Sequence, residues 1–146
     1  MPHGLPANIE LRPFADHDYA DLPRLFALLE SDLSADIVSS RIAPMRAQGW
    51  VCLGAYAEGR LVAMAGYSQR RHLFSGPVIY VENVVVMPVW RSHKLGQALM
   101  SWIEEHARAT GCCKITLDAY TVNQVAQAFY KGLGYDPRGV HFVKEL

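Results

Sequence analysis

The chain has 146 residues, of which 51% are hydrophobic and 19% charged, and this length and balance are typical of one globular domain with a sizeable core. Its fourteen basic and fourteen acidic residues cancel, so net charge does not draw the protein to nucleic acid or to an anionic membrane. We therefore expect a single domain over residues 1–146, with neither nucleic acid nor a membrane as a partner.

Targeting signals and metal-binding patterns are not evident in the sequence. No apolar run reaches membrane-spanning length, and residues 1–6 lack the charged and apolar parts of a signal peptide, so we expect a cytoplasmic protein. Cys52, Cys112 and Cys113 are an odd set with one adjacent pair, which favours reduced, buried thiols over a disulfide framework. The six histidines are scattered, so we expect no metal site.

The first fifty residues predict a strand and two helical regions. Apolar and polar residues alternate over residues 8–12, which is the period of a half-buried strand. Helical spacing follows, and Pro23, tolerated only in a first turn, places the start of that helix near residues 18–21. In the second region, residues 34–48, Pro44 should leave two short pieces. Such a broken element can flank an acceptor entrance, although an ordinary kinked helix is the simpler interpretation.

Three apolar runs then predict an antiparallel meander. Residues 50–57 and 60–69 are separated by Glu58-Gly59, a spacing typical of a tight hairpin. The third run covers residues 78–86, after a basic and aromatic loop over residues 70–75.

The last part of the chain predicts a strand–helix–strand unit and one more helix and strand. Apolar residues recur at helical spacing over residues 95–107, and Gly111 should end this helix. A strand over residues 113–118 follows, and the right-handed crossover makes it parallel to the strand before the helix. Asn123 can cap a further helix, and residues 139–144 predict a final strand. The fold class is therefore α+β with a mixed sheet.

The turn before the long helix is suited to an anion. A helix start presents unpaired N–H groups and about half a positive charge, and Arg91, His93 and Lys94 add basic side chains there. A merely solvated basic turn is an equally good interpretation of the spacing. The turn fits neither the Walker nor the Rossmann glycine pattern.

Two segments carry a more specific pattern. The first is Val86-x-Pro88-x-x-Arg91-x-x-Lys94-Leu95-Gly96-x-x-Leu99. The second is Asn123-x-x-Ala126-x-x-Phe129-Tyr130-Lys131-x-x-Gly134-Tyr135. In this order they resemble the two signatures of the GCN5-related N-acetyltransferase (GNAT) superfamily, of which the first binds acetyl-CoA. Local features, including residues 81–86 and 111–118, are similar to glucosamine-6-phosphate N-acetyltransferases.

This resemblance implies a GNAT-type central mixed sheet, with an antiparallel meander followed by a parallel strand–helix–strand and flanked by helices. It also implies transfer of an acetyl group from acetyl-CoA to a primary amine of a small molecule, directly in a ternary complex. Dimers are common in the superfamily, so a homodimer is an option.

The resemblance implies two catalytic residues. Glu82, on the strand before the turn, matches a carboxylate that removes the amine proton, although a lone strand glutamate is otherwise an ordinary surface residue. Tyr130 matches the tyrosine that gives a proton to the leaving sulfur, and without the resemblance it would be a core aromatic.

The resemblance also implies binding residues. Arg70 and Arg71 would bind an anionic acceptor, or would simply be solvated. Asn123 would contact the cofactor or cap its helix. The expected cofactor-binding set is Val84, Val85, Val86, Arg91, Ser92, His93, Lys94, Leu95, Gly96, Gln97, Asn123 and Phe129.

The sequence departs from the family pattern at Ser92 and Lys94, where the family most often has glycine. Lys94 could crowd the diphosphate or pair with it. The alternative function is therefore a catalytically impaired acyl-CoA-binding regulatory module. His106, on the apolar face of the long helix, is expected to be a core residue rather than a catalytic one.

Overall fold

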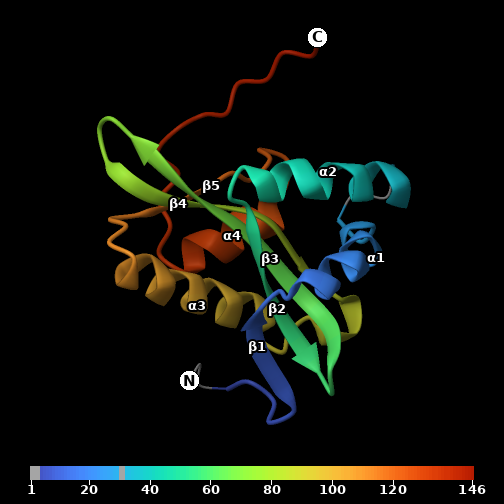
Figure 1. Cartoon of the computed structure of the whole chain (residues 1–146). Coiled ribbons are helices and arrows are strands. Elements are labelled where there is room, and N and C mark those ends of the chain that lie inside the picture. The colour runs from blue at the N-terminus through green and yellow to red at the C-terminus, as the bar shows by residue number, and fades with distance from the viewer. Residues whose placement is uncertain (1–3, 30–31) are drawn as a thin grey trace. The chain divides into compact units, whose positions relative to one another are not determined.

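The structure, a computed structural model, describes residues 4–29 and 32–146 (Figure 1). The chain forms two compact units, Met1–Thr116 and Leu117–Leu146. That the two together make one domain stays a prediction. Among the described helices, none is long and apolar enough to cross a membrane.

A five-stranded mixed sheet, ordered β1-β2-β3-β4-β5, organises the first unit. The antiparallel meander is confirmed, since β1 pairs with β2, β2 with β3 and β3 with β4, all antiparallel. The parallel pair is β4 and β5, and the Ile79 N–H donates to the carbonyl of Lys114 at 3.1 Å. The strands are β1 (Ile9–Pro13), β2 (Val51–Ala57), β3 (Arg60–His72), β4 (Gly76–Val86) and β5 (Ile115–Leu117).

The turns of the meander differ in how well the sequence predicts them. Glu58 and Gly59 have φ of 50° and 79°, as a tight hairpin with two left-handed positions requires. The prediction of a loop over residues 70–75 is wrong, because β3 continues to His72, which pairs with Gly76 of β4. Backbone pairing with β4 holds these basic residues extended, so only residues 73–75 form the turn.

A bulge interrupts β4 at the centre of the sheet. Met64 pairs with Val85 and Gly66 with Glu82, so two residues of β4 lie opposite one residue of β3. Asn83, inside the bulge, has φ of 58°. A bulge of this kind bends the strand and redirects the side chains beside it.

The region before α2 forms less α-helix than the spacing of apolar residues predicts. A 3-10 turn, η1 (Asp16–Asp21), precedes a short α1 (Leu22–Phe26). The start predicted near residues 18–21 agrees with Asp21 as the N-cap of α1. Before it, Asp18 accepts a 2.7 Å hydrogen bond from the N–H of Ala15 in the tighter 3-10 turn. Pro23 lies in the first turn of α1, as expected.

The second helix, α2 (Ala35–Ala47), is continuous. The break predicted at Pro44 is therefore wrong. Pro44 removes only one hydrogen bond, to the carbonyl of Ser40, and both residues are exposed, so water can satisfy that carbonyl. Ser34 caps the helix by accepting from the N–H of Ile37 at 3.2 Å.

The helices cover the two faces of the sheet. The core cluster around Leu22, Leu25, Val38 and Met64 joins α1 and α2 to one face. On the other face, α3 (Leu95–Ala109) packs against the middle strands, after the short turn η2 (Pro88–Trp90) (Figure 1). Most of the buried residues of α3 are those that its helical spacing predicts, namely Leu95, Ala98, Leu99, Ile103 and Ala107. Met100 is buried as well without having been predicted, and the predicted Trp102 and His106 are half-buried.

The second unit contains α4 (Gln124–Gly132), which begins after Asn123 as predicted. The final strand predicted over residues 139–144 is wrong, because those residues have no strand conformation. A strand needs a neighbour for its backbone groups, and no backbone hydrogen bond is present for residues 136–146 within the described chain. Val140 and Phe142 are accordingly exposed.

Candidate active site

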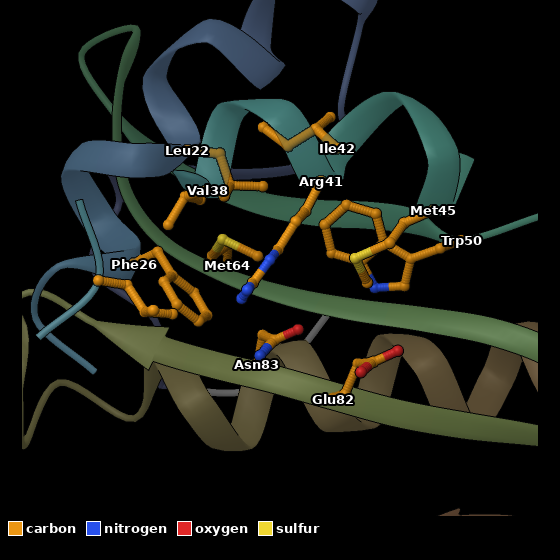
Figure 2. A pocket seen from close by; sticks show the side chains of 11 residues that line it. Leu22, Phe26, Val38, Arg41, Ile42, Met45, Trp50, Met64, Glu82 and Asn83 are labelled. Carbon is orange, nitrogen blue, oxygen red and sulfur yellow. The ribbon is translucent and has the colours of Figure 1, made fainter. Parts of the chain in front are cut away.

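A pocket in the first unit opens between α1, α2 and the bulged part of the sheet (Figure 2). Its volume is about 180 Å³. Three of its residues are polar and the others are apolar or aromatic. The lining is Leu22, Phe26, Leu33, Val38, Arg41, Ile42, Met45, Trp50, Met64, Glu82 and Asn83.

Glu82 and Asn83 form the polar floor of this pocket. Both side chains extend from β4 toward the helices above (Figure 2). Glu82 is half-buried and lies opposite Gly66, where an added Cβ would meet the Trp50 ring nitrogen at 2.5 Å. The glycine therefore lets the Trp50 ring lie flat against the sheet beside Glu82. The bulge thus presents one carboxylate to an apolar cavity.

Cys52 lies in the core on the same side of the sheet. Burial raises the pKa of its thiol well above the ordinary value, and the negative charge of Glu82 raises it further. Because the thiolate form is disfavoured, Cys52 is an inert core residue. Cys112 is also buried, as expected. The prediction of a buried thiol is wrong for Cys113, which is exposed and donates to the carbonyl of Ser75 at 3.1 Å.

Arg41 is a pocket residue that the sequence analysis missed. It reaches down from α2 toward Asn83, across the cavity from Glu82 (Figure 2). A usable signal was present, since Arg41 lies three residues after Val38 and four before Met45 and so shares their helix face.

The turn before α3 has the backbone that glycine would favour. Ser92 and Lys94, at the two positions where the family most often has glycine, have φ of 67° and 61°. Left-handed conformation costs a non-glycine residue roughly 1–2 kcal/mol. The chain therefore keeps the glycine-type turn despite both substitutions.

The start of α3 fits an anionic group. Within the described chain, the N–H groups of Leu95, Gly96 and Gln97 have no backbone partner, and the first turn contains no acidic residue. Arg91 folds back, its Nε donating to the carbonyl of Val86 at 3.3 Å. The Lys94 side chain lies near Gly4, where an added Cβ would be 3.8 Å from its Nζ.

The second unit contains Tyr130. Its ring meets those of Phe129 and Tyr135 edge to face, with centroids 5.1 Å and 5.9 Å away. Burial raises the pKa of the Tyr130 phenol above its ordinary value, so the group holds its proton. Asn123 caps α4 by accepting from the N–H of Ala126 at 3.0 Å, and its contact with a cofactor stays a prediction.

The other predicted residues fall into two groups. Val84 lies in the bulge, and Val85 and Val86 follow it and lead to the turn; their contact with a cofactor stays a prediction. Arg70 and Arg71 are exposed near the far end of β3, and Arg70 stacks over the ring of Tyr80 at 3.8 Å. Neither arginine lines the described pocket, and their role in binding an acceptor stays a prediction.

His106 is a packed residue, as expected. Its ring stacks on Trp102 with centroids 5.3 Å apart and meets Tyr67 edge to face at 5.5 Å. These contacts place it in the packing between α3 and β3.

Known N-acetyltransferases are similar to this chain over most of its length. A glucosamine 6-phosphate N-acetyltransferase of Trypanosoma brucei brucei is 29% identical over 134 residues, 88% of this chain and 89% of that protein. An aminoglycoside N(6′)-acetyltransferase type 1 of Acinetobacter genomosp. 13 is 26% identical over 138 residues, 90% of this chain and 84% of that protein.

Solved structures have the same fold. A Trypanosoma brucei acetyltransferase is similar at TM-score 0.77 with 29% identity, covering 94% of this chain and 99% of that one. An aminoglycoside N-acetyltransferase in complex with CoA has TM-score 0.83 with 20% identity, and the match covers 99% of this chain and 98% of that one. A profile described as the acetyltransferase (GNAT) family matches residues 15–135. The chain therefore belongs to the acetyltransferase (GNAT) family, a family of N-acetyltransferases.

Proposed function

We propose that the protein transfers an acetyl group from acetyl-CoA to a primary amine of a small molecule, directly and in a ternary complex. The observation that supports this most is the Glu82 carboxylate at the floor of an apolar pocket. The same strand, β4, leads from Glu82 toward the turn at residues 91–94 and the start of α3. An acceptor site and an anion site would thus follow one another along the chain.

Glu82 acts as the base in this proposal. An alkylamine has a pKa near ~10.4, like that of lysine, so at neutral pH it enters as an ammonium ion and must lose a proton before it can attack. A Glu82 carboxylate oxygen accepts that proton, directly or through a water molecule. The apolar walls favour the neutral amine further, because desolvation disfavours the charged form.

Acetyl-CoA would lie against the backbone of Val84–Val86, with its diphosphate at the start of α3. When bound it supplies a thioester, whose C–S bond breaks as the C–N bond to the amine forms. The N–H groups of Leu95, Gly96 and Gln97 bind the phosphate oxygens. Tyr130 gives its phenolic proton to the departing sulfur, and the raised pKa means that the phenol carries this proton at neutral pH.

The names of the relatives support an amine acceptor. They act, by name, on glucosamine 6-phosphate or on an aminoglycoside, and both compounds carry amines. We also propose a cytoplasmic location, supported by the free thiols Cys52, Cys112 and Cys113. Homodimer formation stays a prediction.

A second candidate is an acyl-CoA-binding regulatory module that has lost catalysis. Ser92 and Lys94 favour it, because both hold a conformation that glycine adopts without cost. The retained Glu82 and Tyr130 favour the enzyme.

A free-thiol release assay with acetyl-CoA and a panel of primary amines separates the two candidates. The enzyme releases CoA thiol in proportion to an amine, and the N-acetylated product appears by mass spectrometry. A protein that is stabilised against heat by acetyl-CoA but releases no thiol with any amine would be the regulatory module.

A further inference from the structure

We infer that the acceptor is a small monoamine with an apolar body and a carboxylate beside the amine, the chemistry of an α-amino acid with an apolar side chain. This inference rests on the proposed function, because it assigns the acceptor of the same pocket. The supporting observations are the pocket's size, the apolar character of its walls, and the placement of its two charged side chains.

The walls suit an apolar body. Phe26 and Trp50 supply aromatic surface, and Ile42, Met45 and Met64 are among the aliphatic residues that complete the cavity. A polyhydroxylated sugar would lose hydrogen bonds to water against such walls, which costs free energy for each unsatisfied hydroxyl. Among the described lining residues, the neutral side chains that can hydrogen-bond are Asn83 and Trp50, whose ring N–H has no partner there. Sugars are therefore poor acceptors for this pocket.

The size of the cavity points to a small acceptor. Its volume is about 180 Å³, below the roughly 300–1,000 Å³ typical of pockets for drug-sized ligands. A multi-ring aminoglycoside would extend well outside it. A body about the size of a leucine or phenylalanine side chain is the better match.

The charges point to one amine and one acid. Glu82 is the one carboxylate among the described lining residues, so a polycation would find a single partner here. Arg41 would repel every further ammonium group. The same positive charge lowers the pKa of a nearby amine and so favours its reactive neutral form.

Arg41 differs from the other arginines on this side of the sheet. Arg12, Arg24 and Arg46 each form an ion pair with an aspartate, at 2.7, 2.9 and 2.7 Å. Arg41 forms none with any described residue. A guanidinium at a pocket wall can bind an acceptor carboxylate through two parallel hydrogen bonds.

The two charged side chains enter the pocket from opposite sides. Arg41 descends from α2 and Glu82 rises from β4 (Figure 2). A zwitterion with adjacent amine and carboxylate can therefore place its acid toward α2 and its amine toward Glu82, with the apolar side chain among the walls. The acceptor would be held in one orientation.

The test compares paired acceptors in the thiol-release assay. The pairs are phenylalanine with phenethylamine and leucine with isopentylamine, and glucosamine 6-phosphate and an aminoglycoside complete the panel. We expect kcat/KM to be highest for the two amino acids. Arg41→Gln should lower kcat/KM for the amino acids about 10–100-fold, as loss of a charged hydrogen bond does, and leave the decarboxylated amines nearly unchanged.

Arg46→Gln is the matched control, because it removes the same charge from the same helix outside the pocket lining. Arg46→Gln should leave unchanged the ratio of kcat/KM for each amino acid to kcat/KM for its decarboxylated amine. If the protein acetylates the sugar phosphate or the aminoglycoside but neither amino acid, the inference is overturned and the N-acetyltransferase proposal stands.

A binding measurement keeps the inference testable without turnover. If no amine releases thiol, the N-acetyltransferase proposal fails. Calorimetry with phenylalanine then tests, without turnover, whether the pocket binds an amino acid. Binding that Arg41→Gln weakens and Arg46→Gln does not would support the inference. Absence of binding to the wild-type protein would overturn it.

Discussion

The acceptor pocket and the turn at residues 91–94 belong to the same compact unit but are built in different ways. The turn and the first residues of α3 form one short contiguous stretch, and its working groups are mainly backbone N–H groups. The pocket instead combines side chains from α1, α2, β3, β4 and the residue before β2. Side-chain changes should therefore affect the pocket more than the turn.

This difference separates two sources of specificity. Backbone groups recognise a feature common to a class of ligands, such as a diphosphate, and tolerate Ser92 and Lys94 as long as the chain keeps its path. Side chains that line a cavity recognise the individual acceptor.

The largest expected effect comes from the floor of the pocket. Glu82→Gln removes the base and should lower kcat about 10²–10⁴-fold at neutral pH. The loss should shrink as the pH rises, because a growing share of the amine is then already neutral. Thiol release across pH measures this, with the exposed Glu105→Gln as the control. Equal rates for Glu82→Gln and wild type at every pH would remove Glu82 from the mechanism.

Tyr130→Phe should lower kcat about 10²-fold, because it removes only the proton donor. Burial holds the pKa of the phenol above its ordinary value of 10.0, so the wild-type enzyme should keep this proton up to that pH. Tyr120→Phe, an exposed tyrosine of the same unit, is the control. Unchanged turnover in Tyr130→Phe would make this residue a packing aromatic only.

Asp18 lies in η1, directly before α1, whose residues line one wall of the pocket. Its substitution tests how much the ion pair there stabilises the fold. The ion pair with Arg12, at 2.7 Å, lowers the pKa of the buried Asp18 carboxyl, and the N–H of Ala15 adds to this effect. Asp18→Asn should lower the free energy of unfolding by about 2–3 kcal/mol at neutral pH. Urea denaturation measures this.

The pH dependence of that stability has a definite sign. The folded pKa of Asp18 is below the unfolded one, so its contribution is complete above the ordinary carboxyl value of ~3.9 and is lost as the pH falls through the folded pKa. The wild-type protein and Asp18→Asn should therefore converge in acid. A difference that stays constant with pH would contradict the ion-pair account.

The smallest effect is expected at the turn. Lys94→Gly and Lys94→Ala both remove the charge, but only glycine relieves the positive φ, so Lys94→Gly should be the more stable by about 1 kcal/mol. For both variants we expect the Kd for CoA to rise less than tenfold over the wild-type value, because the loss of one exposed charge contact has an effect of this size. Much tighter CoA binding by Lys94→Gly would show that the lysine side chain blocks the diphosphate.

The fold was predictable where local spacing and packing agree. The buried stripe of α3 and the Glu58-Gly59 hairpin follow directly from the sequence, because each depends on neighbouring residues. The short α1, with the 3-10 turn before it, and the unbroken α2 depend on contacts that local spacing does not contain. A hydrogen bond to Asp18 fixes the first, and solvent exposure around Pro44 permits the second.

The same limit applies to the candidate site. The family resemblance pointed to Glu82 and the turn, which lie in one contiguous segment; Glu82 lines the pocket, and the roles of both stay proposals. Arg41 was missed because its place in the pocket depends on how α2 lies over the sheet, which sequence spacing shows only in part. Arg70 and Arg71 were chosen for their charge, and they lie outside the described pocket lining.

The most direct test of the central claim, that the pocket binds the acceptor and the turn binds the cofactor, is to fill the pocket with Ile42→Trp. The side chain of Ile42 lines the cavity from α2, and the larger ring would occupy it. We measure N-acetylated product by mass spectrometry and CoA binding by calorimetry, after a thermal melt shows that the variant is folded. We expect Ile42→Trp to lose product formation while its Kd for CoA stays within threefold of the wild-type value, a difference of roughly 0.6 kcal/mol in binding free energy. Undiminished product formation by the folded variant would contradict it.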